Sequence, residues 1–318
     1  MTGEPWDKKI WTPRPEMVPT AEGELTCAAP AKLNLSLQVL GVRDDGLHDI
    51  DSIVAKVTLC DELVLRRRDD GQVRLTCCGY DCGPAEDNLV CRAGRLLAEA
   101  AGTPPPGADI SLVKAIPPGS GLGGGSSDAA AALKGLSVLW NLELGESELA
   151  DLAGRLGSDV PLFLGPPASR VRGRGLRVDA IDLTPFVALV YLPDLHCATS
   201  EVYAAWDAIH AGRSARRGPG DGSSKWSAMV SAGQIRGPAS SWRGELVNDL
   251  SEAAVQVRPA LADIRTRLGD ATAMPVHITG SGSAVFMLFD SVERLLEARA
   301  ALPADMRPCC RAVMLNPW

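Results

Sequence analysis

The sequence predicts an α/β protein (α+β) of two domains that share a cleft. A chain of 318 residues, 46% of them hydrophobic, is long enough to bury the cores of two domains. Segments that alternate apolar and polar residues, typical of strands, occur along with segments that have helical spacing. One glycine-serine segment lies in each half of the chain, at 117–127 and at 280–284. We therefore expect each half to line one side of the cleft.

The first half of the chain predicts a sheet covered by helices. Residues 1–23 contain prolines and show no periodicity, so we expect a flexible extension. The segment Leu33–Val39 alternates apolar and polar residues, as a half-buried strand does. The same criteria predict strands at 50–57, 61–66 and 110–116, and helices at 88–101, 127–139 and 147–156.

The second half begins with an apolar segment at 186–192 that predicts a buried strand. Residues 212–244 are rich in Gly, Ser and Arg and lack periodicity. They could form a lid that carries Arg216, Arg217 and Lys225, but a solvated insertion is the more common explanation for such a segment. A helix at 251–268 and strands at 276–279 and 285–289 complete the prediction.

Composition excludes several classes of protein. A formal net charge of −7 argues against a general nucleic-acid-binding protein. The sequence has neither an apolar run of membrane-spanning length nor the apolar core of a signal peptide, so we expect a cytoplasmic protein without a membrane partner. The nine cysteines are then expected to be reduced thiols. Only Cys78 and Cys82 approach the spacing of structural zinc ligands, so we predict no metal site.

The segment from Pro117 to Asp128 contains five glycines and three serines directly before an alanine-rich predicted helix. Glycine lets the backbone approach a ligand closely, and the free N–H groups at a helix start bind anions. This segment therefore predicts a phosphate-binding loop.

This segment could be one of three kinds of glycine loop or a flexible linker. A Walker loop needs a lysine where Gly125 stands, so it is excluded. The dinucleotide pattern G-x-G-x-x-G is present, but the segment after the predicted helix has helical spacing instead of a second strand. The kinase pattern P-x-x-x-G-L-G-[SG]-[GS]-S-S is reproduced from Pro117 to Ser127. A kinase loop is favoured, with a glycine linker as the simpler alternative.

Two further positions are candidates for chemistry. Lys32 and Asn34 lie two residues apart on a predicted strand, and therefore on one face. Burying a lysine without a partner is costly, which favours a site residue over an edge-strand lysine at Lys32. Asp159 lies between a helix end and an apolar segment, where it could be a turn residue or a site residue. The residues themselves leave that choice open.

Four segments occur in the order typical of the GHMP kinases: PAKLNL at 30–35, PPGSGLGGGSSDAAAAL at 117–133, GSDVP at 157–161 and ITGSGSAVF at 278–286. The sequence resembles this superfamily from about residue 27 to residue 289. Within it, the resemblance is to the kinases of 4-diphosphocytidyl-2-C-methyl-D-erythritol.

The resemblance implies a domain organisation and an activity. An ATP-binding domain at 24–170 would resemble the second domain of ribosomal protein S5, and a substrate domain at 171–318 would be ferredoxin-like. ATP and Mg²⁺ would be the cofactors. The acceptor would be the 2-hydroxyl of the cytidine diphosphate-linked polyol, in the methylerythritol phosphate route to isoprenoids. A monomer or a homodimer would carry this activity, without nucleic acid or membrane partners.

The resemblance also assigns roles to residues. Asp159 would be the general base, and Lys32 would lie beside it and polarise the attacking hydroxyl. The ATP phosphates would be bound by Pro117, Gly119, Gly121, Leu122, Gly123, Gly124, Gly125, Ser126 and Ser127. The substrate would be bound by Asn34, His48, Thr199, Tyr203, Gly280, Ser281 and Gly282, with His48 bonded to the cytosine, Tyr203 stacked on it and the three late residues near the γ-phosphate.

One residue departs from the family pattern. The family typically has D-G-Y-H where this chain has Asp45-Gly46-Leu47-His48. Leucine covers a base by apolar contact but has no π face. This departure motivates an alternative, a GHMP kinase for another small alcohol such as homoserine, mevalonate or a sugar. A non-catalytic ATP-binding module is a second alternative, against which the presence of both Lys32 and Asp159 argues.

Overall fold

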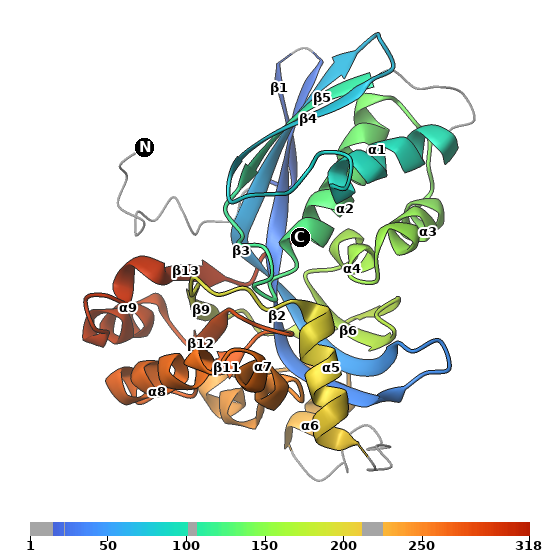
Figure 1. Ribbon diagram of the computed structural model, residues 1–318. Coiled ribbons are helices and arrows are strands. Elements are labelled where there is room, and N and C mark those ends of the chain that lie inside the picture. The colour runs from blue at the N-terminus through green and yellow to red at the C-terminus, as the bar shows by residue number, and fades with distance from the viewer. Residues whose placement is uncertain (1–14, 22, 101–106, 212–224) are drawn as a thin grey trace.

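The computed structural model describes residues 15–21, 23–100, 107–211 and 225–318. Two long strands lie at the centre of the fold (Figure 1). Strands β2 (Glu24–Val42) and β3 (His48–Arg68) pair antiparallel along almost their whole length. The two strands predicted at 50–57 and 61–66 are therefore one strand. Pro30 pairs with Cys60 and Ala31 with Val57, so a bulge at residues 58–59 of β3 interrupts the alternation between the two predicted segments.

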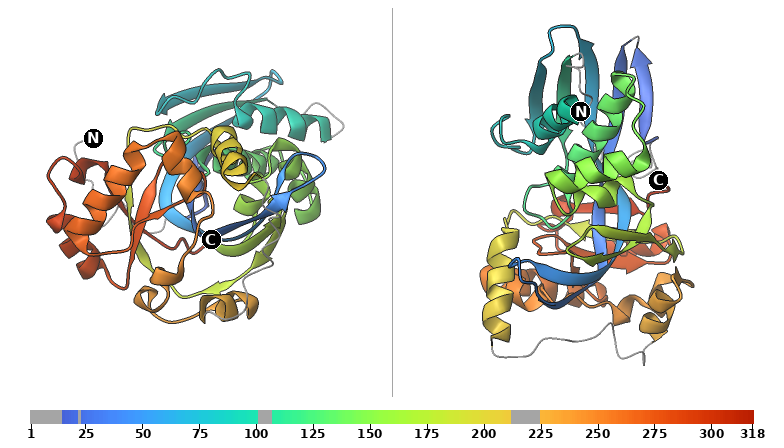
Figure 2. Two further views of the ribbon diagram at one scale, coloured as in Figure 1. Left: turned by 60° about the horizontal axis from the view of Figure 1, so that its bottom comes forward. Right: turned by 90° about the vertical axis from the view of Figure 1, so that its right-hand side faces the viewer.

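The larger sheet has the strand order β1-β2-β3-β5-β4, and β6 and β7 extend it from β3. Helices cover one face of it (Figures 1 and 2), and their apolar residues form one core with the sheet. The bounds are β1 (Met17–Ala21), β4 (Val73–Gly79), β5 (Gly107–Lys114), β6 (Ala168–Gly173), β7 (Arg177–Ala180), α1 (Leu89–Ala100), α2 (Gly124–Leu139), α3 (Glu146–Leu156) and α4 (Val160–Leu164).

Two boundaries in this half differ from the prediction. Within the expected extension 1–23, β1 pairs with β2 as an edge strand, where Pro19 is tolerated because one side of the strand needs no partner. Residues 1–14 and 22 lie outside the described residues. Helix α2 begins at Gly124, three residues before its predicted start, so two of the loop glycines belong to its first turn.

The smaller sheet is antiparallel, with the order β11-β12-β9-β13. Alternate residues of β9 face opposite sides: Leu189 packs with the C-terminal helices, and Val190 packs with the core around β2 and β3. This strand is buried throughout, as the apolar segment predicts. The bounds are β9 (Val187–Tyr191), β11 (His277–Ile278), β12 (Val285–Phe289), β13 (Cys310–Met314), α5 (Thr199–His210), α7 (Ser251–Val257), α8 (Ala260–Thr272) and α9 (Val292–Ala301).

The helix predicted at 251–268 is two helices, α7 and α8. Pro259 precedes the first residue of α8, and a proline cannot continue the hydrogen bonding of α7. Helix α5, β13 and α9 were not predicted. A small parallel pair is formed by β8 (Asp182–Leu183) and β10 (Gln234–Ile235).

The expectation of a solvated insertion at 212–244 is wrong for the described part of that segment, residues 225–244. Trp226, in α6 (Lys225–Ser231), and Trp242 are buried, and their ring centroids lie 5.7 Å apart. These aromatic side chains fix the segment in the core because their burial removes a large apolar area from water. Two residues expected on a lid lie outside the described residues, Arg216 and Arg217.

The cysteines differ from the expectation of nine reduced thiols. Cys77, on β4, forms a disulfide with Cys82, which follows the end of that strand at Gly79 (φ 90°). The remaining seven cysteines are not part of this disulfide.

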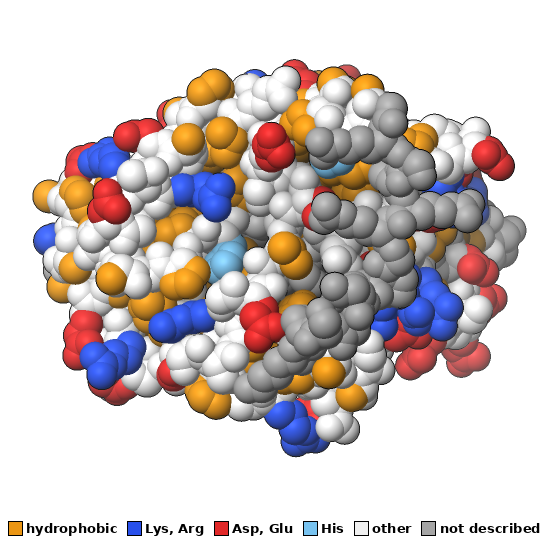
Figure 3. Space-filling model, turned by 90° about the horizontal axis from the view of Figure 1, so that it is seen from below, with side chains coloured by type: hydrophobic (Ala, Val, Ile, Leu, Met, Phe, Trp, Pro, Cys, Tyr) orange, Lys and Arg blue, Asp and Glu red, His pale blue; other side chains and the backbone are white. Residues whose placement is uncertain are grey.

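Across the parts of the chain that are described, no group of three or more His, Cys, Asp or Glu residues is placed to hold a metal ion. None of the described helices combines the length and apolar character needed to cross a membrane. On the face seen from below, the described acidic and basic side chains are intermixed (Figure 3).

Candidate active site

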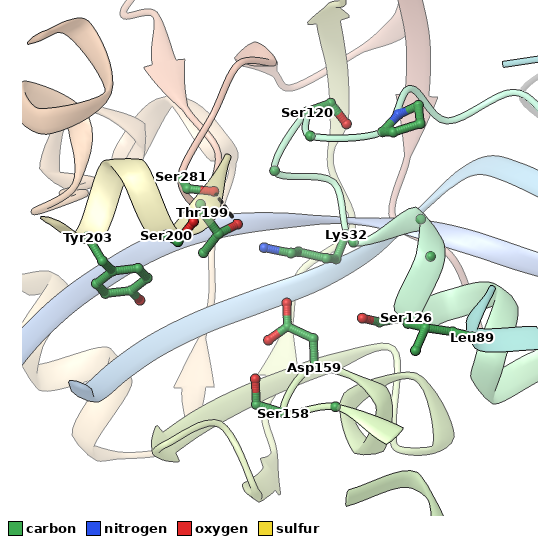
Figure 4. Close-up of a pocket in the computed structure, with 18 of the residues that line it drawn as sticks. Lys32, Leu89, Ser120, Ser126, Ser158, Asp159, Thr199, Ser200, Tyr203 and Ser281 are labelled. Atoms are coloured by element: carbon green, nitrogen blue, oxygen red, sulfur yellow. Dashed lines mark hydrogen bonds between the residues drawn. The ribbon is translucent and has the colours of Figure 1, made fainter. Parts of the chain in front are cut away.

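A cavity of ≈ 1200 Å³ is lined by residues from both halves of the chain. Its wall includes β2, the glycine loop, the start of α2, residues 157–159, α5 and the second glycine segment (Figure 4). Most of the predicted site residues line it: Lys32, Asn34, His48, Pro117, Gly119, Gly121, Gly123, Gly124, Gly125, Ser126, Asp159, Thr199, Tyr203, Gly280 and Ser281. Three of them lie behind the wall: Leu122, Ser127 and Gly282.

The glycine loop is shaped by its contact with the second glycine segment. Gly121 has a φ of 78°, and a Cβ there would lie 2.2 Å from the carbonyl oxygen of Thr279. The backbone N–H of Ala284 donates to the carbonyl of Ser120 at 2.9 Å. Only glycine allows this approach in this conformation. The two segments therefore form one continuous wall, whereas their positions in the sequence predict that each lines its own side of the cleft.

Helix α2 directs its first turn at the cavity. Gly123 is its N-cap with a φ of 74°, and the next three residues line the cavity. The N–H groups of a first helical turn have no partner within the helix, and the helix dipole is positive there. This end of the cavity is therefore suited to phosphate.

Lys32 and Asp159 face each other across the cavity. Lys32 comes from β2 and is buried, whereas Asp159 caps the start of α4 and is half-buried. Their charged groups point towards one another (Figure 4). Burial lowers the pKa of Lys32, and the negative charge of Asp159 acts in the opposite direction. A carboxylate beside a buried ammonium can take a proton from a hydroxyl placed between them.

A hydrogen-bond network fixes the head of Lys32. Its ammonium donates to Asn34 Oδ1, and Asn34 Nδ2 donates to Ser52 Oγ at 2.8 Å. Thr279 Oγ1 accepts from the Asn34 backbone N–H at 3.0 Å. Because both halves of the chain contribute, the network couples the position of Lys32 to the second glycine segment. Ser52 and Thr279 were not predicted, since their contacts are formed only by the folded chain.

A second buried ion cluster lies behind the glycine loop and was missed by the sequence analysis. Lys114 donates to Asp61 and, at 2.7 Å, to Asp128 Oδ2. The other oxygen of Asp61 accepts from the backbone N–H groups of Ala115 (2.6 Å) and Ile116 (2.8 Å). The cluster thus ties the two ends of the loop to β3. A lysine that ends an apolar strand directly before the loop was the available signal.

Burial raises the pKa of Asp128 to about 8, and the negative charge of Asp61 acts in the same direction. Lys114 and Asp128 line the cavity, whereas Asp61 is completely buried.

The far end of the cavity is formed by the β2–β3 hairpin and α5. The rings of His48 and Tyr203 lie 4.5 Å apart, and His48 Nε2 lies 2.8 Å from Asp207 Oδ1. His48 is therefore packed against α5 instead of standing free on a surface turn. Leu47 lines the same end with 48% of its surface exposed. Asp207 and Arg174 also line the cavity and were not predicted.

Oxygen donors for Mg²⁺ are present at the phosphate end. This ion usually takes one or two protein carboxylates together with phosphate oxygens and water. The Asp159 carboxylate and the Ser126 hydroxyl both line the cavity close to the start of α2. The Ser126 hydroxyl fits a ligand of a phosphate-bound ion, and the Asp159 carboxylate adds negative charge nearby.

Family models match both halves of the chain. The model "GHMP kinases N terminal domain" matches residues 88–165, and "GHMP kinases C terminal" matches residues 238–307. Solved structures of a homoserine kinase from Cytophaga hutchinsonii (18% identity, TM-score 0.59, 94% of this chain and 96% of that one) and of mevalonate kinase from L. major (14%, 0.63, 96% and 99%) share the fold.

Relatives with higher sequence identity identify one family within the GHMP kinases. A 4-diphosphocytidyl-2-C-methyl-D-erythritol kinase of Pelotomaculum thermopropionicum is 38% identical over 87% of this chain and 93% of its own length. One of Prochlorococcus marinus is 35% identical over 94% of both chains. A solved 4-(cytidine 5'-diphospho)-2C-methyl-D-erythritol kinase superposes with a TM-score of 0.70 at 33% identity, covering 92% of this chain and 99% of that one. The chain therefore belongs to the GHMP kinases, in the family of 4-diphosphocytidyl-2-C-methyl-D-erythritol kinases.

Proposed function

We propose that this chain transfers the γ-phosphate of ATP to the 2-hydroxyl of 4-diphosphocytidyl-2-C-methyl-D-erythritol, a step in making isoprenoid precursors. Its family makes it an ATP-dependent kinase of an alcohol group. The observation that carries the proposal is the pairing of Lys32 with Asp159 beside a glycine loop that opens a helix.

In this proposal Asp159 is the general base. It accepts the proton of the 2-hydroxyl as the oxygen attacks the γ-phosphorus and the bond to the β-phosphate oxygen breaks. Lys32 holds the hydroxyl oxygen and stabilises the negative charge that develops on it. The lysine can do so because Asn34 fixes its ammonium. Phosphoryl transfer depends mainly on such positioning and on electrostatic stabilisation.

The phosphates of ATP would lie along the glycine loop. Free N–H groups at the start of α2 would donate to their oxygens, and Gly280 and Ser281 would close the γ-phosphate end. Mg²⁺ would be held by the phosphate oxygens with Ser126, where it would neutralise charge, and the Asp159 carboxylate would stay free to accept the proton. The division into an ATP-binding domain, 24–170, and a substrate domain, 171–318, stays part of the proposal.

The acceptor would occupy the end between the hairpin and α5. Asn34 would donate to the polyol, and Thr199, whose hydroxyl lies 3.1 Å from that of Ser281, would contact it near the phosphate. His48 would bond to the cytosine and Tyr203 would stack on it, which their position at one end of the cavity supports.

Leu47 supports a second candidate, a kinase of an alcohol without a cytidine group. Its side chain is half exposed at the cavity end where the family has an aromatic ring. A smaller alcohol such as homoserine, mevalonate or a sugar would not need that ring.

The test is product analysis after incubation with ATP, Mg²⁺ and each of these alcohols. The proposal expects ADP formation with the cytidine diphosphate-linked polyol and a new phosphate ester whose ³¹P signal couples to no carbinol proton, because carbon 2 carries no hydrogen. A new ester on homoserine, mevalonate or a sugar alone would establish the second candidate. ATP binding without any ester would leave only a binding module.

A further inference from the structure

Helix α4, which begins directly after Asp159, is held at its C-terminal end by a buried lysine. Lys56, on β3, has 1% of its surface exposed. Its ammonium donates to the carbonyl oxygens of Gly165 at 2.6 Å and Phe163 at 3.2 Å. Phe163 lies in the last turn of α4 and Gly165 follows the helix. The carbonyls at the end of a helix receive no hydrogen bond from an N–H group within it.

The register of the sheet places this lysine opposite Lys32. The two residues are direct partners in the β2–β3 ladder, so their side chains extend from the same face of the sheet. Lys32 faces Asp159 at the first end of α4, and Lys56 binds the carbonyls at the other end. The five-residue helix is thus bracketed by two lysines from neighbouring strands.

The apolar contacts of α4 hold it in the core but supply no directional bond at its end. Val160 and Phe163 are buried, and a Cβ on Gly123 would lie 2.8 Å from the Phe163 ring. Apolar packing holds the helix against α2 but is not directional. A helix of five residues is also too short to be stable alone. Directional bonds at its end therefore add to the packing in fixing where Asp159 lies.

We propose that Lys56 is a positioning residue for the reaction, acting on Asp159 through α4. Its two hydrogen bonds fix the C-terminal end of the helix, and its positive charge lies where the helix dipole favours a cation. The inference rests on the proposed role of Asp159 as the base. Burial lowers the pKa of Lys56 to about 8, consistent with a lysine kept from water for a structural purpose.

The test compares Lys56→Met, Lys56→Arg and Thr58→Val. Methionine matches the length of lysine and removes both donors and the charge, so the core stays filled. Arginine keeps donors and charge. Thr58, two residues along β3, is also buried, but its hydroxyl accepts from the N–H of Met314, away from α4. Thr58→Val is therefore a matched loss of one buried hydrogen bond on the same strand.

Two experiments are needed. Steady-state kinetics gives kcat and KM for ATP, and hydrogen exchange reports on the backbone amides of residues 159–165. We expect Lys56→Met to lower kcat by about 10- to 100-fold with KM for ATP unchanged, because a misplacement of about 1 Å can have an effect of this size. Exchange of the segment should accelerate, and Lys56→Arg should restore part of both. Thr58→Val should change neither, even at an equal loss in unfolding midpoint.

An unchanged kcat in Lys56→Met would overturn the inference, and so would an equal loss in Thr58→Val. Slow exchange in the segment of the methionine variant would also contradict it. If the unaltered protein transferred no phosphate to any alcohol, the proposed function would fail instead, while exchange would still report whether Lys56 holds α4.

Discussion

The two ends of the cavity are built differently. At the phosphate end, the chain is shaped by glycines with positive φ, by a helix start and by the buried ion cluster of Lys114 with Asp61 and Asp128. At the hairpin end, half-exposed side chains from β3 and α5 meet across the cavity, with Leu47 beside them. The first arrangement is suited to positioning a reaction and the second to choosing a substrate. Changes at the first end should therefore reduce kcat or ATP binding, and changes at the second should raise KM for the acceptor.

The largest effect is expected for Asp159→Asn. The amide keeps the size of the side chain but cannot accept the proton, and loss of a positioned base costs ~10²–10⁴ in rate. We expect kcat to fall by that factor, with the Kd for ATP changed little, as measured by calorimetry. Retention of most of the turnover would assign the base to another group.

Gly121→Ala tests the joint between the two glycine segments. The added Cβ would lie 2.2 Å from the Thr279 carbonyl oxygen, in a backbone conformation that disfavours side chains. We expect ATP binding to be lost or strongly weakened. Gly244→Ala is the control for an added methyl group, because a Cβ there meets no atom within 4 Å and Gly244 does not line the cavity. Equal ATP affinity in the two variants would contradict the proposed shape of the loop.

Tyr203→Leu tests the hairpin end. Loss of a stacking ring costs about 1–3 kcal/mol per base, which corresponds to a rise in KM for the cytidine substrate of about 5- to 150-fold. The kcat and KM for ATP should hold, because Tyr203 lies away from the glycine loop. Tyr203→Phe keeps the ring and should behave like the unaltered protein. A fall in kcat without a change in KM for the acceptor would contradict the assignment of substrate choice to the hairpin end of the cavity.

The smallest expected effect is on how the free energy of unfolding depends on pH. The pKa of Asp128 is raised to about 8 in the folded protein, so the folded state keeps a proton that the unfolded state releases at lower pH. The free energy of unfolding should therefore decrease as pH rises between about 4 and 8. Asp128→Asn lacks this group, so its stability should fall less over that interval in urea unfolding. Parallel curves for the two proteins would show that Asp128 does not hold the extra proton.

Much of the phosphate end could be predicted from the sequence because glycines, a helix start and a lysine on a strand act locally. The pairing of Lys32 with Asp159 depended on the family resemblance, since 127 positions separate the two residues. The contacts of Lys56 and Asp61 could not be predicted, because each joins elements whose meeting is decided by the whole fold.

Errors in the fold have related causes. The bulge that joins two predicted strands into β3 depends on pairing with β2, and the burial of Trp226 and Trp242 depends on the core beneath them. A sequence pattern reports which residues are apolar but not which surface they will meet. The long strands and the buried strand β9 were predictable in part because their alternation or apolar run extends over several residues.

The most direct test of the account is kcat/KM for ADP formation with 4-diphosphocytidyl-2-C-methyl-D-erythritol, measured beside homoserine, mevalonate and galactose at saturating ATP and Mg²⁺. The account expects saturable turnover with the cytidine substrate and kcat/KM at least about tenfold lower for the others, since they lack the group that His48 and Tyr203 would bind. Turnover of a smaller alcohol with an equal or higher kcat/KM would contradict it.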